Sequence, residues 1–296
     1  MDACTIVISR SNAPDAERHD FEETLAGRCA AEGLHTLVVP DLYHVPPDAN
    51  LILALRAIRE PIVLFSWHWP RAAFWTLRQF GVRGVRADAL SDDFASEELR
   101  PIVSHNLADK CCPDRWLDHV QELLGGQSPG GSPAVERLDE AVGERWYPVI
   151  DYERCTGCRE CLEFCLFGVY EIDDEDRVVA SQPDACKPGC PACSRVCPSQ
   201  AIMFPLHETD EAIAGSDEGS IQAFDPGLPS VDELKRQYEE GKVSIQDVLR
   251  ACGCKAKSLP SERGAACCPD REGDGAHAED KDRGYFDRLI DGLVKD

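Results

Sequence analysis

Short apolar runs alternate with longer amphipathic stretches over the first 125 residues. Runs rich in isoleucine, leucine and valine predict strands, and they cover residues 5–8, 36–39 and 62–65. Apolar residues at helical spacing predict helices over residues 15–33, 49–59, 71–80 and 113–124. Val85 and residues 102–103 indicate further short strands. Strands that alternate with helices are typical of a parallel sheet covered on both faces, so we expect an α/β parallel-sheet domain over residues 1–125.

Glycine, serine and proline then dominate residues 125–133, a composition typical of a flexible linker. We place the clearest domain boundary here and assign residues 126–146 to the linker. The pattern of residues 134–145 predicts a short helix within it.

The last third of the chain combines helical and polar stretches. Residues 206–257 are predicted to be a helical segment, in which Ser230 and Glu233 fit a capping box. Residues 258–284 are polar and rich in Gly, Asp and Glu, which is typical of a disordered linker. Residues 285–296 return to an amphipathic helical pattern.

Charge narrows the function classes. The chain has 31 Lys and Arg against 54 Asp and Glu, a formal net charge of −23. Nucleic acid and anionic membrane surfaces repel such a chain, so we expect neither as a partner. No apolar run reaches the roughly 18 residues of a membrane helix, so we expect no membrane insertion. The first four residues lack the basic and apolar regions of a secretory signal, which favours the cytoplasm.

Cysteine is used far above the ordinary level, with 16 residues in 296. In a reducing compartment these residues favour metal ligation over disulfides. Eight of them form two tandem quartets, and three of the four pairs between the quartets are offset by 32 residues. The remaining pair, Cys155 and Cys186, is offset by 31. The quartets are therefore an internal duplication.

Within each quartet, three thiolates spaced two residues apart can wrap one face of a cubane cluster from a tight loop. A fourth cysteine three residues on is expected where the chain enters a helix, pointing toward the cluster of the other repeat. This pattern resembles the bacterial-type two-cluster 4Fe-4S ferredoxin domain, over residues 147–205. The resemblance implies an α+β domain with two clusters. It assigns to cluster 1 the residues Cys155, Cys158, Cys161 and Cys197. It assigns to cluster 2 the residues Cys186, Cys190, Cys193 and Cys165.

The chain departs from that pattern at two points. Pro198 follows the fourth cysteine of the second quartet, as in the family, but Leu166 stands at the equivalent position of the first. One extra residue lies between Cys186 and Cys190. The alternatives are a zinc site built from two C-x2-C pairs, and clusters with a purely structural role.

The other eight cysteines give weaker signals. Cys4 and Cys29 lie in apolar patterns and are predicted to be core residues. The pentapeptide Cys-Cys-Pro-Asp-Arg occurs at residues 111–115 and again at 267–271. An extra metal site could form from Cys252, Cys254, Cys267 and Cys268. The alternative is a flexible tail with reduced thiols.

In the first domain, a ligand would bind beyond the carboxyl ends of the strands. No glycine-rich nucleotide-binding motif follows any predicted strand. Trp67, His68 and Trp69 follow the third strand and could stack on a planar cofactor such as flavin, although aromatic residues at such positions are more often packing residues. Residues 66–80 resemble a segment near the start of one heterodisulfide reductase subunit, but the cysteine expected there is absent.

No catalytic set stands out among the eight scattered histidines. The sequence therefore predicts an iron–sulfur electron-transfer protein with two 4Fe-4S clusters, a subunit or carrier for a redox enzyme, with redox proteins as partners. The first alternative is a flavin- or other cofactor-dependent oxidoreductase with the clusters as an internal relay. The second is a redox or metal sensor.

Overall fold

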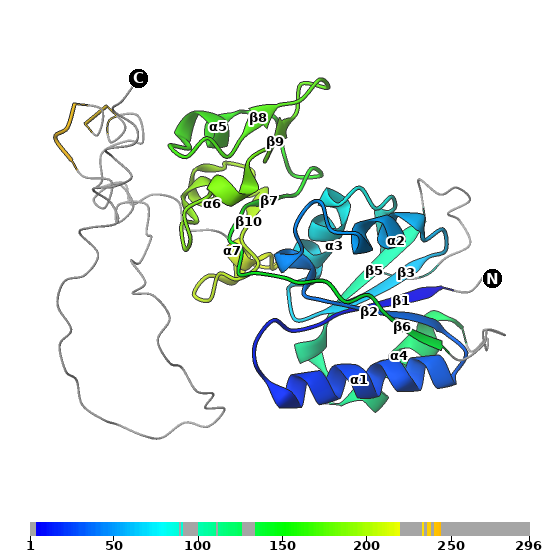
Figure 1. Cartoon of the computed structure of the whole chain (residues 1–296). Helices are drawn as coiled ribbons and strands as arrows, with labels where there is room; N and C mark the ends of the chain where they lie inside the picture. The colour runs from blue at the N-terminus through cyan, green and yellow to red at the C-terminus, as the bar shows by residue number, and fades with distance from the viewer. Residues whose placement is uncertain are drawn as a thin grey trace, which may run out of the picture. The chain divides into compact units, whose positions relative to one another are not determined.

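The N-terminal part of the chain is built on a six-stranded sheet in the order β4-β5-β3-β1-β2-β6 (Figure 1). A computed structural model describes residues 4–88, 90, 100–110, 112–125 and 134–219, together with residues 233, 236–237 and 240–243. Every strand pairing in this sheet is parallel. The strands are β1 (Thr5–Ser9), β2 (His35–Val39), β3 (Ile62–Ser66), β4 (Val85–Arg86), β5 (Pro101–Asn106) and β6 (Ala134–Arg137).

Helices cover both faces of this sheet, as the sequence predicted. They are α1 (Ala16–Ala31), α2 (Leu51–Ala57), α3 (Pro70–Gln79) and α4 (Pro113–Leu123), with single 3-10 turns over residues 42–44 and 107–109. Successive side chains of a strand point to opposite faces. Ile6 and Ile8 of β1 accordingly pack with Leu25 of α1 and Trp116 of α4, whereas Val7 packs with α2 and α3. The buried runs are apolar because both faces of the sheet are covered.

The predicted helix over residues 134–145 is wrong, because residues 134–137 form β6, which pairs in parallel with β2 at the edge of the sheet. Val135, Leu138 and Val142 stand at helical spacing, which explains the prediction. In the structure Val135 packs against the α1/α4 core, and Arg137 points outward to form an ion pair with Glu23. Pairing with the otherwise unpaired edge of β2 therefore makes residues 134–137 a strand despite the helical spacing of the apolar residues.

Residues 147–216, here called the ferredoxin part, form a smaller α+β arrangement. Each cysteine repeat contributes one short helix, α5 (Glu160–Phe164) or α6 (Ala192–Val196). β7 (Val149–Ile150) pairs antiparallel with β10 (Ile202–Met203), and β8 (Glu171–Ile172) pairs antiparallel with β9 (Val178–Val179). A 3-10 turn over residues 183–185 and the helix α7 (Glu211–Ala214) complete it.

The ferredoxin part packs on the sheet layer through α3 and the segment after β2. The Tyr43 hydroxyl donates to the Tyr147 carbonyl at 2.6 Å, the Tyr147 amide donates back to that hydroxyl at 2.7 Å, and the two rings stack. Gly215 has a φ of +113°, and a Cβ placed on it would lie 2.6 Å from the Cβ of Ala72 on α3. A side chain at position 215 would therefore separate the two surfaces.

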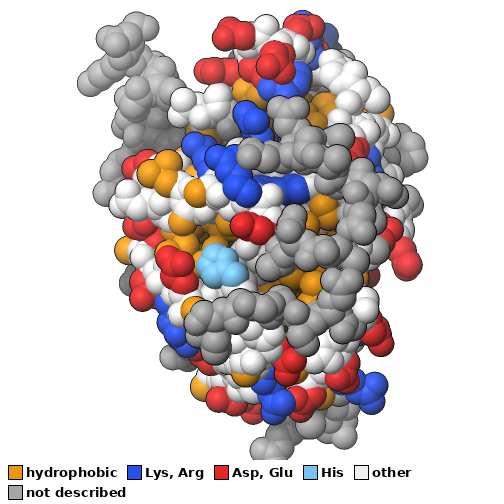
Figure 2. Space-filling view, turned by 90° about the vertical axis from the view of Figure 1, so that its right-hand side faces the viewer, with side chains coloured by type: hydrophobic (Ala, Val, Ile, Leu, Met, Phe, Trp, Pro, Cys, Tyr) orange, Lys and Arg blue, Asp and Glu red, His pale blue; other side chains and the backbone are white. Residues whose placement is uncertain are grey.

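Acidic side chains are spread over the face of the molecule shown in Figure 2, in keeping with the net charge of −23. Within the residues that the structure describes, no helix is both long and apolar enough to cross a membrane. Most of the predicted segments beyond residue 219 lie outside the described residues. This applies to the helix around Ser230, the disordered linker 258–284 and the amphipathic helix 285–296.

Candidate metal centre

The first cysteine loop is shaped by Asp151. The buried Asp151 carboxylate accepts hydrogen bonds from the amides of Glu153 and Arg154, and its carbonyl accepts one from the amide of Cys155. Gly157 and Arg159 then adopt left-handed backbone conformations, with φ of 70° and 66°. These turns bring Cys155 and Cys158 back toward Cys161, the second residue of α5.

The predicted place of the helix relative to the fourth cysteine is wrong. The helices α5 and α6 lie between the third and fourth cysteines, so the chain leaves a helix at Cys165 and Cys197 instead of entering one. Each of these two residues caps the C-terminus of its helix with extended backbone. The Cys165 amide donates to the Cys161 carbonyl at 3.1 Å.

The structure places the fourth cysteine of each quartet, Cys165 or Cys197, near the third cysteine of the other quartet. Burial, as the largest cause, and the neighbouring sulfurs of Cys197, Cys155 and Cys158 together raise the pKa of Cys161 to about 12. Burial likewise raises the pKa of Cys193 well above its usual value, with further contributions from Cys186, Cys190 and Cys165. Cys161 and Cys193 therefore each have sulfur neighbours from both repeats.

These thiols fit a cationic iron–sulfur core. Buried thiols with raised pKa values remain protonated when no cation is near, and a bound metal ion deprotonates them. Among the described residues, no three His, Cys, Asp or Glu side chains are spaced to hold a single metal ion. A cubane does not need that spacing, because it has one iron atom for each of its four thiolates.

Exposure differs among the cysteines. Cys158 is exposed, whereas Cys161, Cys190 and Cys193 are buried. The thiols of the second quartet border the sheet layer, because Cys186 packs against the core beneath α2 and α3. The indole of Trp146 donates to the Cys190 carbonyl at 3.1 Å and stacks on Phe204. The protein therefore shields the thiols of the second quartet from solvent on the side that faces the sheet layer.

Polar groups that the sequence did not reveal contact the sulfurs, among them the Ser199 hydroxyl, 3.5 Å from the Cys197 sulfur. The amide of Ala201 donates to the Cys197 sulfur at 3.3 Å. The Tyr170 hydroxyl is buried without a nitrogen or oxygen partner among the described residues. It faces the sulfur of Cys193. Burial raises the pKa of Tyr170 well above its usual value, and the nearby Cys193 and Cys161 raise it further. The only sequence signal was that Tyr170 follows the apolar Val169 shortly after the first quartet.

In the aromatic motif after β3, the side chains of Trp67 and His68 contact other side chains of the protein. The Trp67 indole donates to the buried Glu22 carboxylate at 2.7 Å, and the guanidinium of Arg18 lies 4.5 Å above its ring. His68 pairs with Asp41 at 2.9 Å. Burial opposes a charged His68, but the adjacent Asp41 carboxylate raises the His68 pKa above its usual value. Sequence reasoning missed Glu22, although it stands three residues before Leu25 on the buried face of α1.

The structure describes three of the eight remaining cysteines. Cys4 and Cys29 are buried, and burial raises their pKa values to about 11 and about 12, so their predicted place in the core is confirmed. Cys112 is half-buried at the start of α4. The candidates for an extra metal site lie outside the described residues: Cys252, Cys254, Cys267 and Cys268.

Comparison with known proteins supports a 4Fe-4S domain. Residues 147–170 match the family described as 4Fe-4S binding domain. The chain is 46% identical over 61 residues to the uncharacterized ferredoxin MJ0251 of Methanocaldococcus jannaschii, covering 20% of this chain and 41% of that relative. It is 44% identical over 55 residues to a ferredoxin of Methanothermococcus thermolithotrophicus, covering 18% of this chain and 88% of that relative. No solved structure matches.

A further similarity is to the pyruvate synthase subunit PorD of Methanocaldococcus jannaschii, 38% identical over 55 residues, covering 19% of this chain and 62% of that relative. The chain therefore contains an iron–sulfur domain of the 4Fe-4S class. Through this domain it belongs to the ferredoxin family, whose chemistry is electron transfer.

Proposed function

We propose that this chain holds two 4Fe-4S clusters and transfers single electrons as a subunit or carrier for a redox enzyme in the cytoplasm. The observation that supports the proposal is that Cys161 has Cys197 of the other repeat among its sulfur neighbours, and Cys193 likewise has Cys165. Cluster 1 is held by Cys155, Cys158, Cys161 and Cys197. Cluster 2 is held by Cys186, Cys190, Cys193 and Cys165.

Each cluster supplies a one-electron couple when bound. The protein holds the sulfurs, excludes water and donates hydrogen bonds to them, and these factors set the potential. The exposed Cys158 gives cluster 1 an edge toward solvent, where a partner can approach. Cluster 2 is covered by Trp146 and the sheet layer. The similarity to a protein named as a subunit of pyruvate synthase supports a redox-enzyme partner.

Cofactor content tests this proposal. Protein purified without oxygen should contain about eight iron atoms per chain, because each of two cubanes holds four. Iron, sulfide, zinc and flavin should be measured together on the same sample. About four irons with a single isolated EPR centre would contradict the two-cluster proposal. Released flavin would favour an oxidoreductase with internal relay clusters. Clearly more than eight irons would indicate a further site at Cys252, Cys254, Cys267 and Cys268.

Tyr170 gives a second test. A hydroxyl that donates to the Cys193 sulfur stabilises the more negative, reduced form of cluster 2. The Tyr170→Phe variant should therefore lower the potential of that cluster by about 40 mV, corresponding to about 1 kcal/mol for one electron. EPR-monitored redox titration measures the shift. Tyr152→Phe is the matched control, because its hydroxyl donates to the Val178 carbonyl. Unchanged potentials in a fully loaded Tyr170→Phe protein would rule out this role.

A further inference from the structure

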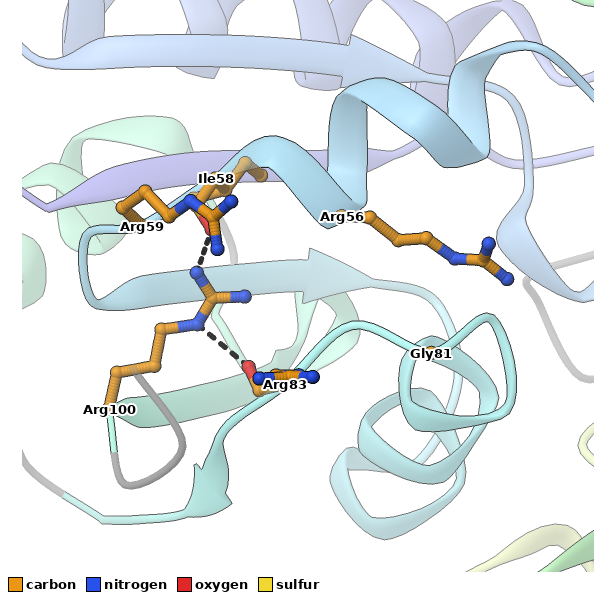
Figure 3. Close-up of a pocket in the computed structure, with 6 residues that line it drawn as sticks. All are labelled: Arg56, Ile58, Arg59, Gly81, Arg83 and Arg100. Atoms are coloured by element: carbon orange, nitrogen blue, oxygen red, sulfur yellow. Dashed lines mark hydrogen bonds between the residues drawn. The ribbon is translucent and has the colours of Figure 1, made fainter. Parts of the chain in front are cut away.

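The polar side chains inside this protein differ in the acceptors that they reach. At the amino-terminal ends of β3, β4 and β5, Arg100 donates from Nε to the Arg83 carbonyl at 2.7 Å and from Nη1 to the Ile58 carbonyl (Figure 3). Such bonds satisfy backbone groups and stabilise the fold. The half-buried Ser199 hydroxyl is different, because it lies 3.5 Å from the Cys197 sulfur. A polar contact to a proposed cluster ligand acts on the site itself.

The turn that follows Cys197 places this hydroxyl. The Gln200 amide donates to the Cys197 carbonyl at 3.1 Å, and Gln200 has a left-handed backbone conformation with φ of 53°. The next amide, that of Ala201, then donates to the same sulfur at 3.3 Å. Arg71 of α3 donates from Nη1 to the Gln200 carbonyl at 3.3 Å. A left-handed conformation at a residue with a side chain persists where surrounding contacts compensate its cost, so the turn is held in place.

Iron binding decides which of the two side chains donates. A free Cys197 thiol and the Ser199 hydroxyl can each donate to the other. An iron-bound cysteine is a thiolate, which has no proton to donate. The hydroxyl is therefore the donor, and its acceptor is a sulfur that already accepts the Ala201 amide. Donors to a ligand sulfur stabilise the more negative, reduced state of the cluster and so raise its potential.

The two repeats differ at this position. The offset of 32 residues places Phe167 opposite Ser199 and Gly168 opposite Gln200. Gly168 has the same left-handed backbone conformation, with φ of 65°, so this feature of the turn recurs in the first repeat. Phe167 packs against the apolar core of the ferredoxin part and has no hydroxyl to donate to Cys165. A hydroxyl at this position therefore serves the fourth cysteine of the second repeat and not that of the first.

We propose that Ser199 makes cluster 1 the more readily reduced of the two clusters, an inference that rests on the proposed function. Solvent acts in the same direction, because Cys158 of cluster 1 is exposed, whereas Cys186 of cluster 2 packs against the core of the sheet layer. On cluster 2 the Tyr170 hydroxyl acts without that exposure. A single electron then passes from cluster 2, which is oxidised from 1+ to 2+, to cluster 1, which is reduced from 2+ to 1+. No bond forms or breaks, and the electron rests at the edge that a partner can approach.

EPR-monitored redox titration of the cluster-loaded full chain tests this inference. In Ser199→Ala the higher of the two midpoint potentials should fall, because one donor to sulfur is lost. At a fixed potential the ratio of reduced to oxidised cluster should drop about fivefold, which corresponds to about 40 mV for one electron. Ser199→Thr keeps the hydroxyl and should keep the higher midpoint. Ser216→Ala is the matched control, because the Ser216 hydroxyl accepts from the Glu218 amide at 3.1 Å.

The Tyr170→Phe variant identifies the two midpoints. It should lower the other midpoint alone, and the double variant with Ser199→Ala should show both shifts. Three outcomes would overturn the inference: unaltered midpoints in a Ser199→Ala protein that holds about eight irons, an equal fall in Ser199→Thr, or a fall of the lower midpoint in place of the higher. About four irons in the unaltered protein would contradict the proposed function and this inference with it, so iron content distinguishes the two failures.

Discussion

Replacing Cys158 and Cys197 together by serine should damage one cluster and spare the other, whereas replacing Cys158 and Cys165 should damage both. The reason is that, in the proposed ligand assignment, the fourth thiol of each repeat binds the cluster of the other repeat. The pKa of Cys161 is raised by burial and by the sulfurs of Cys197, Cys155 and Cys158. For Cys193, the neighbouring sulfurs include Cys165 instead. Serine binds iron less well than thiolate, so each affected cluster should lose iron.

Iron content and EPR of the reduced protein measure the outcome. The Cys158/Cys197 variant should keep one intact four-iron centre, and the Cys158/Cys165 variant should keep none. Cys112→Ser is the matched control, because Cys112 is a half-buried cysteine at the start of α4, outside both quartets. If instead the Cys158/Cys165 variant keeps one intact cluster, each quartet holds its own cluster and the ligand assignment is wrong.

The α/β architecture could be predicted because the strands of the sheet are buried on both faces. Residues 5–8 and 62–65 are therefore almost uniformly apolar, and each is followed by a helix with one apolar face. The edge strand β6 could not be predicted in the same way. It carries a single inward apolar residue, Val135, and its formation depends on the free edge of β2, which only the folded sheet supplies.

The 4Fe-4S class of the domain could be predicted because the cysteines follow a local spacing, and the comparisons support that class. The side chains that surround the cysteines could not be predicted from the sequence. Tyr170 contacts the Cys193 sulfur, and Arg71 contacts Asp151 across 80 residues of sequence. Such contacts depend on packing between segments that are distant in sequence. A buried polar residue within an apolar pattern marks them only weakly.

Arg71 should be the residue outside the cysteine loops whose replacement destabilises the protein most. It is 1% exposed on α3, and its Nη1 lies 3.4 Å from the carboxylate of the equally buried Asp151. Its guanidinium also donates to three carbonyls of the ferredoxin part, those of Gln200, Ala212 and Gly215. The same Asp151 carboxylate shapes the turn that leads to Cys155. Arg71 therefore fixes the first cysteine loop to the sheet layer.

In the Arg71→Met variant the apolar stem is kept, but the carboxylate and three carbonyls lose their donor. Breaking a buried ion pair costs about 3–5 kcal/mol, which predicts a fall in the melting temperature of the cluster-loaded protein of roughly 10 °C. Arg154→Met is the matched control, since Arg154 contacts the same carboxylate at 3.6 Å from a position that is 34% exposed. A partly exposed pair of this kind contributes at most about 1 kcal/mol, so Arg154→Met should shift the melting temperature by about 2 °C or less.

The double variant Arg71→Met with Asp151→Asn separates pairing from packing. If the two side chains stabilise the protein through each other, the double variant should lose less than the sum of the two single losses, because no buried charge is left without its partner. Equal shifts for Arg71→Met and Arg154→Met, or strictly additive losses in the double variant, would show that Arg71 acts only by filling space beside α3. Thermal unfolding followed by circular dichroism and by loss of the cluster absorption should then report whether the loop of Cys155 and the sheet layer unfold together. Arg71 predicts a single shared transition in the unaltered protein.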